Sequence, residues 1–286
     1  GEMEIAGRSF TPRERARAMN RLSAADIICI GAQRAMTSWL HRILSVHPDT
    51  SAFPNCDPIT STSKEAHYWD WNHHRGQDWY RILMRPLNDA QLSLDFTPEY
   101  AFMSAENIAE CRAINPTAKI IYILRDPLAR AISAIRMRTM WATQNASADE
   151  HQITFGRDFL YRCQNAQIWQ QGAYAANVQR WRAHYPDLLL VNYEHLQRNP
   201  MDEIKRIFDH CQLSFDDLPA PTRDKIQNRS SEVIWKTHPY QLDSDCFYFL
   251  HGVTWPERNA AESELGMRFE EGADLRFPDG ANFLEA

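Results

Sequence analysis

Residues 27–40 read IICIGAQRAMTSWL, and this stretch decides the fold class. The run at 27–30 is short, unbroken and apolar, as is typical of a buried strand, and it ends at Gly31. Apolar residues then recur at helical spacing over 37–46, so we expect a helix there. A strand, a tight loop and a helix therefore follow one another directly.

The same order of strand and helix returns further along the chain. Residues 92–96 (LSLDF) and 119–124 (KIIYIL) read as further buried strands. Each is followed by a proline, Pro98 or Pro127, and proline is common at the first position of a helix. Unbroken apolar strands that alternate with helices predict an α/β fold with a central, mainly parallel sheet flanked by helices on both faces.

The rest of the chain sets the expected domain limits. A strand at 188–191 lies between two expected helices, at about 174–184 and 200–211, and the periodic pattern weakens beyond residue 214. We therefore expect one domain over residues 1–286, with an N-terminal extension (1–23), a core (about 24–213) and an irregular C-terminal tail that wraps around it (214–286).

The charge and the apolar runs exclude two classes of partner. The chain has 286 residues, and 31 Lys and Arg against 37 Asp and Glu give a net charge of −6. Because no basic stripe with interleaved aromatic residues is present, nucleic acid is not an expected partner. The longest apolar runs, 120–124 and 246–250, are far shorter than the roughly 20 residues that a membrane-spanning helix needs.

The six cysteines are widely spaced and include no C-x-x-C pair. Zinc ribbons and redox motifs use such pairs, so neither is supported, and no other spacing predicts a metal site. A chain of this size without a signal-like apolar segment is typical of a reduced, cytoplasmic protein. We therefore expect a cytoplasmic protein without a metal.

The first strand-to-helix junction carries groups that suit an anion. Arg34 adds a fixed positive charge, and Thr37 and Ser38 add hydroxyl groups beside the free N–H groups of a helix start. The loop departs from the pattern G-x-x-x-x-G-K-[ST], because Met36 stands at the second Gly and Thr37 at the Lys. The junction predicts a phosphate or sulfate site without the lysine that serves magnesium nucleotides.

The second junction places Arg125 at the end of a strand and Ser133 on the following helix. An arginine fork and a serine hydroxyl make a compact receptor for a terminal phosphate. Because the carboxyl ends of parallel strands meet at one edge of a sheet, both junctions are expected on that edge. Two anion sites there predict a ligand with a phosphate at each end of a nucleoside.

A third segment, at 63–70, combines a lysine, a carboxylate and an imidazole. In an extended chain, Glu65 and His67 point to one side and Lys64 to the other. Either Glu65 or His67, beside an anion pocket, could act as general base toward an acceptor hydroxyl. Taken alone, the segment is more typical of a solvated surface cluster of charges.

Together, the three segments resemble the sulfotransferases that use 3′-phosphoadenosine 5′-phosphosulfate (PAPS). Residues 31–40 resemble that family's loop for the 5′-phosphosulfate, and residues 125–133 resemble its 3′-phosphate motif. Lys64-Glu65-x-His67-Tyr68 is similar to the K-E-x-H-F/Y segment of the bacterial and heparan-sulfate-type branch. Shorter similarities extend over residues 27 to about 267, nearly the whole chain.

The resemblance implies a P-loop-like, three-layer α/β fold and an enzyme. Its donor would be PAPS and its nucleotide product adenosine 3′,5′-bisphosphate (PAP). The sulfonate group would pass by in-line displacement to a hydroxyl or amine of a small-molecule or carbohydrate acceptor. The transfer does not inherently require a metal, since a sulfonate carries less negative charge than a phosphoryl group.

The resemblance also implies roles for individual residues. Glu65 would be the general base, and His67 would orient it or contact the acceptor. Arg34 would stabilise charge on the bridging oxygen, in place of the family's usual lysine. The residues implied in nucleotide binding are Gln33, Arg34, Ala35, Met36, Thr37 and Ser38 of the loop, Arg125 and Ser133 of the second motif and, through a partial match at 236–239, Lys236.

Two other functions stay open at this point. A P-loop nucleotide kinase would share the fold, although the loop lacks that class's lysine. A sulfotransferase-like binding module without activity would result if Met36 closed the loop, because it replaces a glycine that lets the backbone approach a phosphate. The acceptor pocket is expected to involve the segment near 142–160 and the C-terminal tail.

Overall fold

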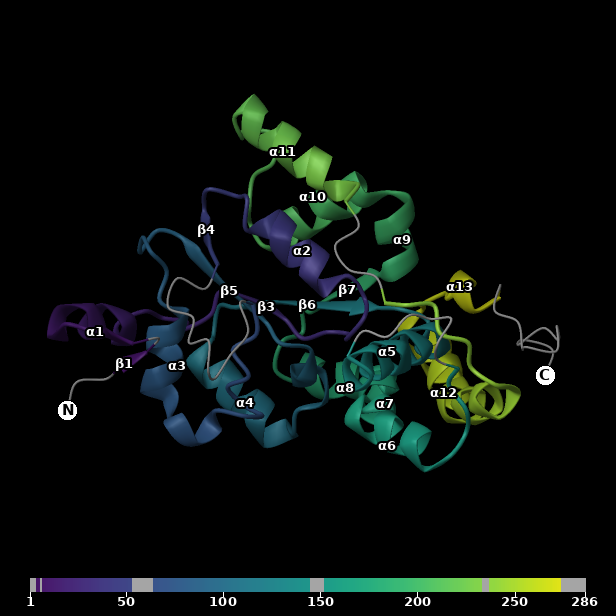
Figure 1. Ribbon diagram of the computed structural model, residues 1–286. Coiled ribbons are helices and arrows are strands. Elements are labelled where there is room, and N and C mark those ends of the chain that lie inside the picture. The colour runs from purple at the N-terminus through teal and green to yellow at the C-terminus, as the bar shows by residue number, and fades with distance from the viewer. Residues whose placement is uncertain (1–3, 6, 53–63, 145–151, 233–236, 274–286) are drawn as a thin grey trace.

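The computed structural model describes residues 4–5, 7–52, 64–144, 152–232 and 237–273, and Figure 1 shows how their helices and strands are arranged. A five-stranded sheet runs through the middle of the molecule, with helices on both of its faces. All four pairs of neighbouring strands are parallel. The α/β fold with a central parallel sheet is therefore confirmed.

The spatial order of the strands shows which of them end side by side. The strands, in spatial order, are β4 (Thr50–Ser51), β5 (Leu92–Phe96), β3 (Ile27–Cys29), β6 (Lys119–Leu124) and β7 (Leu189–Asn192). Ile27 pairs with Leu94 on one side and with Lys119 on the other, so β3 is the middle strand. Because the pairing is parallel, the carboxyl ends of β5, β3 and β6 share one edge.

Helices form a layer on each face of this sheet. In Figure 1 the layer above it contains α2 (Thr37–Leu44), α9 (Tyr193–Arg198), α10 (Pro200–His210) and α11 (Ala220–Ser230). The layer below contains α3 (Gln77–Met84), α4 (Ala105–Ile114), α5 (Pro127–Ala142), α6 (Arg157–Asn165), α7 (Ile168–Gly172), α8 (Tyr174–Arg182) and α12 (Ser244–Leu265). The shorter elements are β1 (Glu4–Ile5), β2 (Arg8–Ser9), α1 (Pro12–Met19), η1 (His73–Arg75), η2 (Pro98–Phe102) and α13 (Glu270–Ala273).

Apolar side chains fill the space between the sheet and its helices. All of β3 is buried, as is all of β6 except its first residue, and α2 buries its apolar face, including Trp39 and Leu44. A second apolar cluster, which includes Phe159 and Leu250, joins α5, α6 and α12. Burial of this apolar surface is the main force that holds the layers together.

Most expected element boundaries agree with the structure, and two regions differ. The strands at 92–96 and 119–124 have the expected limits. After β5, Pro98 opens a 3₁₀ turn, and the α-helix begins only at Ala105, where Ser104 caps it. The two-residue strand β4 was not expected, because so short a run leaves no pattern.

The C-terminal part is helical where an irregular tail was expected. Residues 244–265 form α12, the longest helix among the described residues, and it packs on α5 and α8. Asp243 caps its start by accepting a hydrogen bond from the N–H of Cys246. Pro256 lies inside it. Within the described ranges, no helix is long and apolar enough to cross a membrane.

Candidate active site

The loop between β3 and α2 lies where the sequence predicts the first anion site. Gly31 has a φ of 143°, and a Cβ atom there would lie 3.2 Å from the carbonyl oxygen of Pro98. Met36 has a φ of 66°, in the left-handed region that glycine enters without steric cost. Its half-buried side chain packs against the apolar core. The loop therefore accommodates Met36 in a conformation that suits a glycine.

The backbone amides of residues 33–38 fall into two groups. The N–H of Gln33 donates to the side-chain oxygen of Gln171 at 3.3 Å, and that of Ala35 donates to the carbonyl of Ala32 at 3.2 Å. The amides at the start of α2, from Thr37 onward, have no partner within the helix. An anion at this loop can therefore use the helix-start amides without displacing a hydrogen bond of the helix.

Two arginines join the first junction to the second. The Nε of Arg34 donates to the hydroxyl of Ser133 on α5 at 2.9 Å, and Nη1 of Arg125 donates to the carbonyl of Arg34 at 2.9 Å. Burial and the neighbouring Arg125 lower the pKa of Arg34 to about 10, so its guanidinium stays charged at neutral pH. The structure thus brings these three predicted residues together at one edge of the sheet.

A carboxylate occupies the fork of Arg125. Its Nε and Nη2 donate to the two carboxylate oxygens of Glu271 in α13, at 3.1 and 2.8 Å. The guanidinium also lies over the ring of Tyr193, 4.5 Å from its centroid. Burial lowers the pKa of Arg125, but the hydrogen bonds and charge of Glu271 raise it above its usual value. The fork therefore holds an oxyanion in the two-oxygen geometry that also suits a phosphate.

Further contacts hold the segment around Glu271 against the second junction. The N–H of Glu271 donates to the carboxylate of Glu194. Arg258 of α12 contacts both the carboxylate of Asp126 and the carbonyl of Phe269. These contacts hold residues 269–271 against the start of α5, and no local sequence pattern predicts them.

Glu65 lies near the end of β5 in a cluster of charged side chains. The N–H of Phe96 donates to the carbonyl of Lys64 at 2.9 Å, which fixes this segment beside β5. Nζ of Lys64 lies 3.2 Å from Oε1 of Glu65, and Nε2 of His67 lies 3.5 Å from Oε2. Lys64 therefore contacts Glu65 although the two residues are adjacent, and the segment leaves the extended conformation at His67, which has a φ of 49°.

The imidazole of His67 is held in its charged form. Burial lowers its pKa, but hydrogen bonds with Asp70 and Glu65 and the charge of Glu99 together raise it to about 10. Its Nδ1 donates to Oδ2 of Asp70 at 2.8 Å, and its ring stacks on Trp71 with 3.4 Å between the centroids. An imidazole that keeps both protons at neutral pH cannot accept another.

Asp95 anchors the cluster and was missed by the sequence reasoning. It is fully buried in β5, and burial raises its pKa, against the hydrogen bonds that it accepts. Its carboxylate accepts hydrogen bonds from the N–H of Ala66 (3.2 Å) and from the hydroxyls of Thr97 (2.7 Å), Tyr80 (2.8 Å) and Tyr100 (3.0 Å). An acidic residue inside an apolar strand is the signal that could have revealed it.

The carboxylates around His67 also bring possible metal ligands together. Among the described residues, one atom each from Glu65, His67 and Glu99 lie within 4.8 Å of one another. Burial raises the pKa of Glu99 to about 7, and its Oε2 makes no hydrogen bond. Nδ1 of His67 lies 3.7 Å from that oxygen.

The remaining groups are Arg130, Lys236 and the cysteines. Arg130, also on α5, is fully buried, and its guanidinium nitrogens have no hydrogen-bond partner among the described residues. Lys236 lies outside the described residues. The five cysteines within the described ranges are buried free thiols.

Curated proteins similar to this chain include several heparan sulfate sulfotransferases. Heparan sulfate glucosamine 3-O-sulfotransferase 3A1 of Mus musculus is 31% identical over 195 residues, which are 65% of this chain and 45% of that protein. The human bifunctional heparan sulfate N-deacetylase/N-sulfotransferase 2 is 28% identical over 63% of this chain and 21% of its own length. The chain thus spans less than half the length of these curated relatives.

Solved structures show the same fold. A sulfotransferase from Alicyclobacillus acidocaldarius aligns with a TM-score of 0.60 and 19% identity, over 86% of this chain and 98% of its own. Sulfotransferase STF9 from Mycobacterium avium aligns with a TM-score of 0.57 and 15% identity, over 90% and 81%. The family model described as "Sulfotransferase domain" matches residues 24–241, which include the loop between β3 and α2, the Glu65 segment and the Arg125 junction. This chain belongs to the sulfotransferase family.

Proposed function

We propose that the protein transfers a sulfonate group from PAPS to a hydroxyl or amine of an acceptor by in-line displacement, with Glu65 as general base. The observation that carries this proposal is the meeting of three segments at one edge of the sheet. The phosphate loop follows β3, the Arg125 junction follows β6, and the Glu65 segment is bonded to the end of β5. Such a transfer needs two anion sites for the donor and a base for the acceptor.

The side chains present fit the charges of the donor. The two-oxygen contact of Arg125 with Glu271 supports Arg125 as the receptor of the 3′-phosphate, because the carboxylate stands in for two phosphate oxygens. Ser133 would donate its hydroxyl to the same phosphate. The amides at the start of α2 would hold the 5′-phosphate. Met36 is compatible with a phosphate at this loop, since its side chain packs on the core.

Arg34 would offset negative charge during transfer. When bound, PAPS supplies an activated sulfonate, and charge develops on the oxygen that PAP retains. Arg34 contacts Ser133 and Arg125 and thus lies between the two anion sites. Its guanidinium keeps its protons at neutral pH, so it acts as an electrostatic clamp and hydrogen-bond donor and not as an acid.

Glu65 would take the proton from the acceptor. Lys64 and His67 each contact one of its oxygens, which fixes the carboxylate in place. The raised pKa of His67, about 10, favours Glu65 over His67 as the base, since His67 already carries its proton. His67 and Asp70 then act as positioning residues. A general base contributes about two to four decades of rate.

A comparison of two nucleotides tests the donor. PAP at 100 times its dissociation constant should stabilise the protein by about 2.7 kcal/mol, read as a thermal shift, and ATP with magnesium should not. A shift with ATP alone would favour a nucleotide kinase. In Arg125→Ala, affinity for PAP should fall while affinity for adenosine 5′-phosphate stays. Equal loss for both nucleotides would refute the role of Arg125.

Transfer itself separates an enzyme from a binding module. Radiolabelled sulfonate from PAPS should appear in a member of a panel of glycan, phenol and alcohol acceptors. Tight binding of PAP without any transfer would support the binding module instead. A single domain over residues 1–286 and a reduced, cytoplasmic setting stay predictions, and the five buried free thiols support the second.

A further inference from the structure

Arg130, near the start of α5, is a buried arginine without a partner. Its side chain is fully buried, and among the described residues none accepts a hydrogen bond from its Nε, Nη1 or Nη2. An arginine is almost never fully buried unless it is paired. Because an unpaired charge inside a protein costs free energy, this cation lowers the stability of the fold that holds it. A contribution to ligand binding would offset that cost.

The neighbours of Arg130 do not offset its charge. Burial lowers the pKa of its guanidinium, Tyr174 and Tyr122 raise that pKa, and the positive charge of Arg125 lowers it. Burial also raises the pKa of both phenols, so they are neutral at physiological pH. An arginine in a protein nevertheless keeps its proton. Arg130 is therefore a fixed cation that these neighbours leave without a counter-charge.

Arg130 lies beside the second junction, next to the groups proposed to bind the 3′-phosphate. The hydroxyl of Tyr174 donates to the carbonyl of Arg125 at 2.7 Å, and the rings of Tyr174 and Tyr122 meet edge to face with 5.8 Å between their centroids. Ser133 follows Arg130 by three residues, so the two share one face of α5. Because Arg130 is buried, its charge lies beneath these groups.

The two anions that compete for Arg125 differ in charge. In the structure its fork holds the carboxylate of Glu271, which carries one negative charge. A phosphate monoester carries about 1.5 to 2 negative charges at pH 7. A nearby buried cation attracts each anion in proportion to its charge, and the attraction reaches further through a protein interior than through water. Arg130 therefore favours a phosphate over Glu271 at the same fork.

We infer that Arg130 determines the specificity for the 3′-phosphate of the donor by its charge, without contacting that phosphate. This inference rests on the proposed function, in which Arg125 and Ser133 bind the phosphate directly. The cost of burying the cation is then offset when the phosphate arrives. A nucleotide without a 3′-phosphate gains less, because its 5′-phosphate would lie at the start of α2.

A purely structural role for Arg130 fits the contacts less well. An arginine that holds elements together does so through hydrogen bonds of its guanidinium, as Arg258 does with Asp126 and the carbonyl of Phe269. Arg130 makes no such bond among the described residues. Its stem can pack against apolar side chains, but a methionine would do so equally well. A structural role therefore leaves the charge itself unused.

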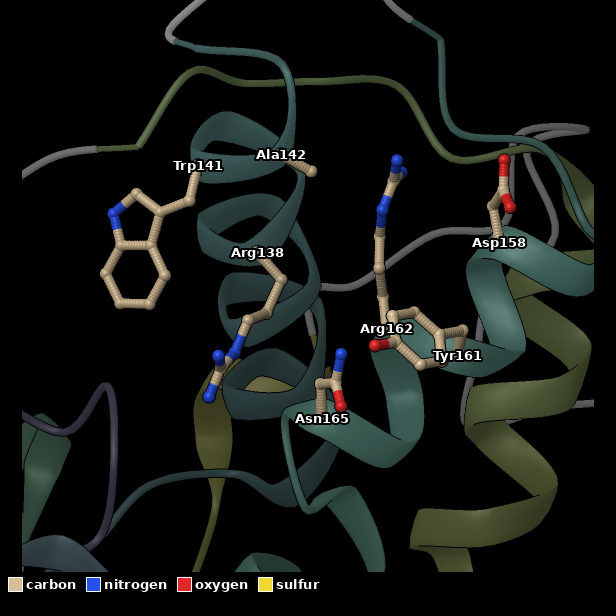
Figure 2. Close-up of a pocket in the computed structure, with 7 residues that line it drawn as sticks. All are labelled: Arg138, Trp141, Ala142, Asp158, Tyr161, Arg162 and Asn165. Atoms are coloured by element: carbon tan, nitrogen blue, oxygen red, sulfur yellow. The ribbon is translucent and has the colours of Figure 1, made fainter.

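The test compares variants at two positions of α5. Arg130→Met removes the charge and keeps an unbranched apolar side chain, and Arg130→Gln removes the charge but stays polar. The matched control is Arg138→Met, eight residues later and about 12 Å along the helix axis. The Nε of Arg138 is also buried without a hydrogen-bond partner among the described residues. Figure 2 shows Arg138 in the lining of a surface pocket near the end of α5, and its guanidinium lies 5.3 Å from the ring centroid of Trp141.

Titration calorimetry measures the affinity for PAP and for adenosine 5′-phosphate. Both Arg130 variants should bind PAP about 10-fold more weakly than the wild type, at about 0.1 M and at about 0.3 M salt alike, because salt screens a buried charge little. Their affinity for adenosine 5′-phosphate should change by less than about threefold, as should the affinity of Arg138→Met for PAP. Without nucleotide, Arg130→Met should be at least as stable to urea as the wild type.

Several results would overturn the inference. Wild-type affinity for PAP in both Arg130 variants would do so, as would an equal loss for both nucleotides or a loss of the same size in Arg138→Met. An Arg130→Met protein that does not fold, or that is less stable than the wild type without nucleotide, would assign the arginine a structural role instead. In all of these results the wild type still binds PAP. A wild-type protein that does not bind PAP would overturn the proposed function itself.

Discussion

The contact between Glu271 and Arg125 leads to a prediction about the affinity for PAP. In the structure the carboxylate of Glu271 takes both hydrogen-bonding positions of the Arg125 fork. A 3′-phosphate that uses this fork must first displace the carboxylate. Neutralising it in Glu271→Gln should therefore tighten the binding of PAP, since the competitor loses its charge.

The size of the effect follows from the distances and the exposure of the pair. Two unit charges about 4 Å apart attract each other by about 4 kcal/mol at an effective dielectric constant of 20, and desolvation cancels much of this. The side chains of Arg125 and Glu271 are 16% and 27% exposed, so the pair is neither a free surface pair nor fully buried. If the Arg125–Glu271 contact contributes a net free energy of about 1–2 kcal/mol, its loss changes the dissociation constant of PAP by roughly 5- to 30-fold.

Titration calorimetry with PAP and with adenosine 5′-phosphate measures this directly. In Glu271→Gln only PAP should bind more tightly, because adenosine 5′-phosphate lacks the group that competes for Arg125. The matched control is Glu270→Gln, whose carboxylate pairs with the exposed Arg198 in the same segment. Unchanged or weaker PAP binding in Glu271→Gln would refute the reasoning, and so would an equal gain in Glu270→Gln.

Three further predictions concern the cluster around Glu65. Asp95→Ala should lower the free energy of unfolding by about 3–5 kcal/mol in urea titrations, since it removes the acceptor of four buried donors; a loss below about 1 kcal/mol would contradict this. The raised pKa of Glu99, about 7, means that the folded state binds this proton more tightly than the unfolded state. Its contribution to the free energy of unfolding should therefore fall as pH rises from about 4.5 to 7, by at most about 3 kcal/mol, and the difference between wild-type and Glu99→Gln melts should follow that curve. Sulfonate transfer should be unaffected by a metal chelator; loss of activity that added metal restores would instead assign a metal to Glu65, His67 and Glu99.

The strands and both strand-to-helix junctions could be predicted from the sequence, because their signals are local. The apolar runs at 92–96 and 119–124 give strands with the expected limits, and the loop with Arg34 needs only the strand before it and the helix after it. The parallel pairing then brings Arg34 and Arg125 together, as the rule for the carboxyl ends of strands requires.

The remaining contacts could not be predicted, because they depend on residues far apart in the sequence. Glu271 reaches Arg125 across 146 positions, and Gln171 reaches the amide of Gln33 across 138. The contact of Lys64 with Glu65 depends on how two adjacent side chains turn, and the alternation of an extended chain does not encode it.

The central claim is that Glu65 is the base for sulfonate transfer at this edge of the sheet. The most direct measurement compares wild-type protein with Glu65→Gln at saturating PAPS, using radiolabelled sulfonate and an acceptor that the wild type modifies. The account predicts that turnover falls by about two to four decades while the dissociation constant for PAP stays within about threefold. Turnover equal to that of the wild type would contradict it.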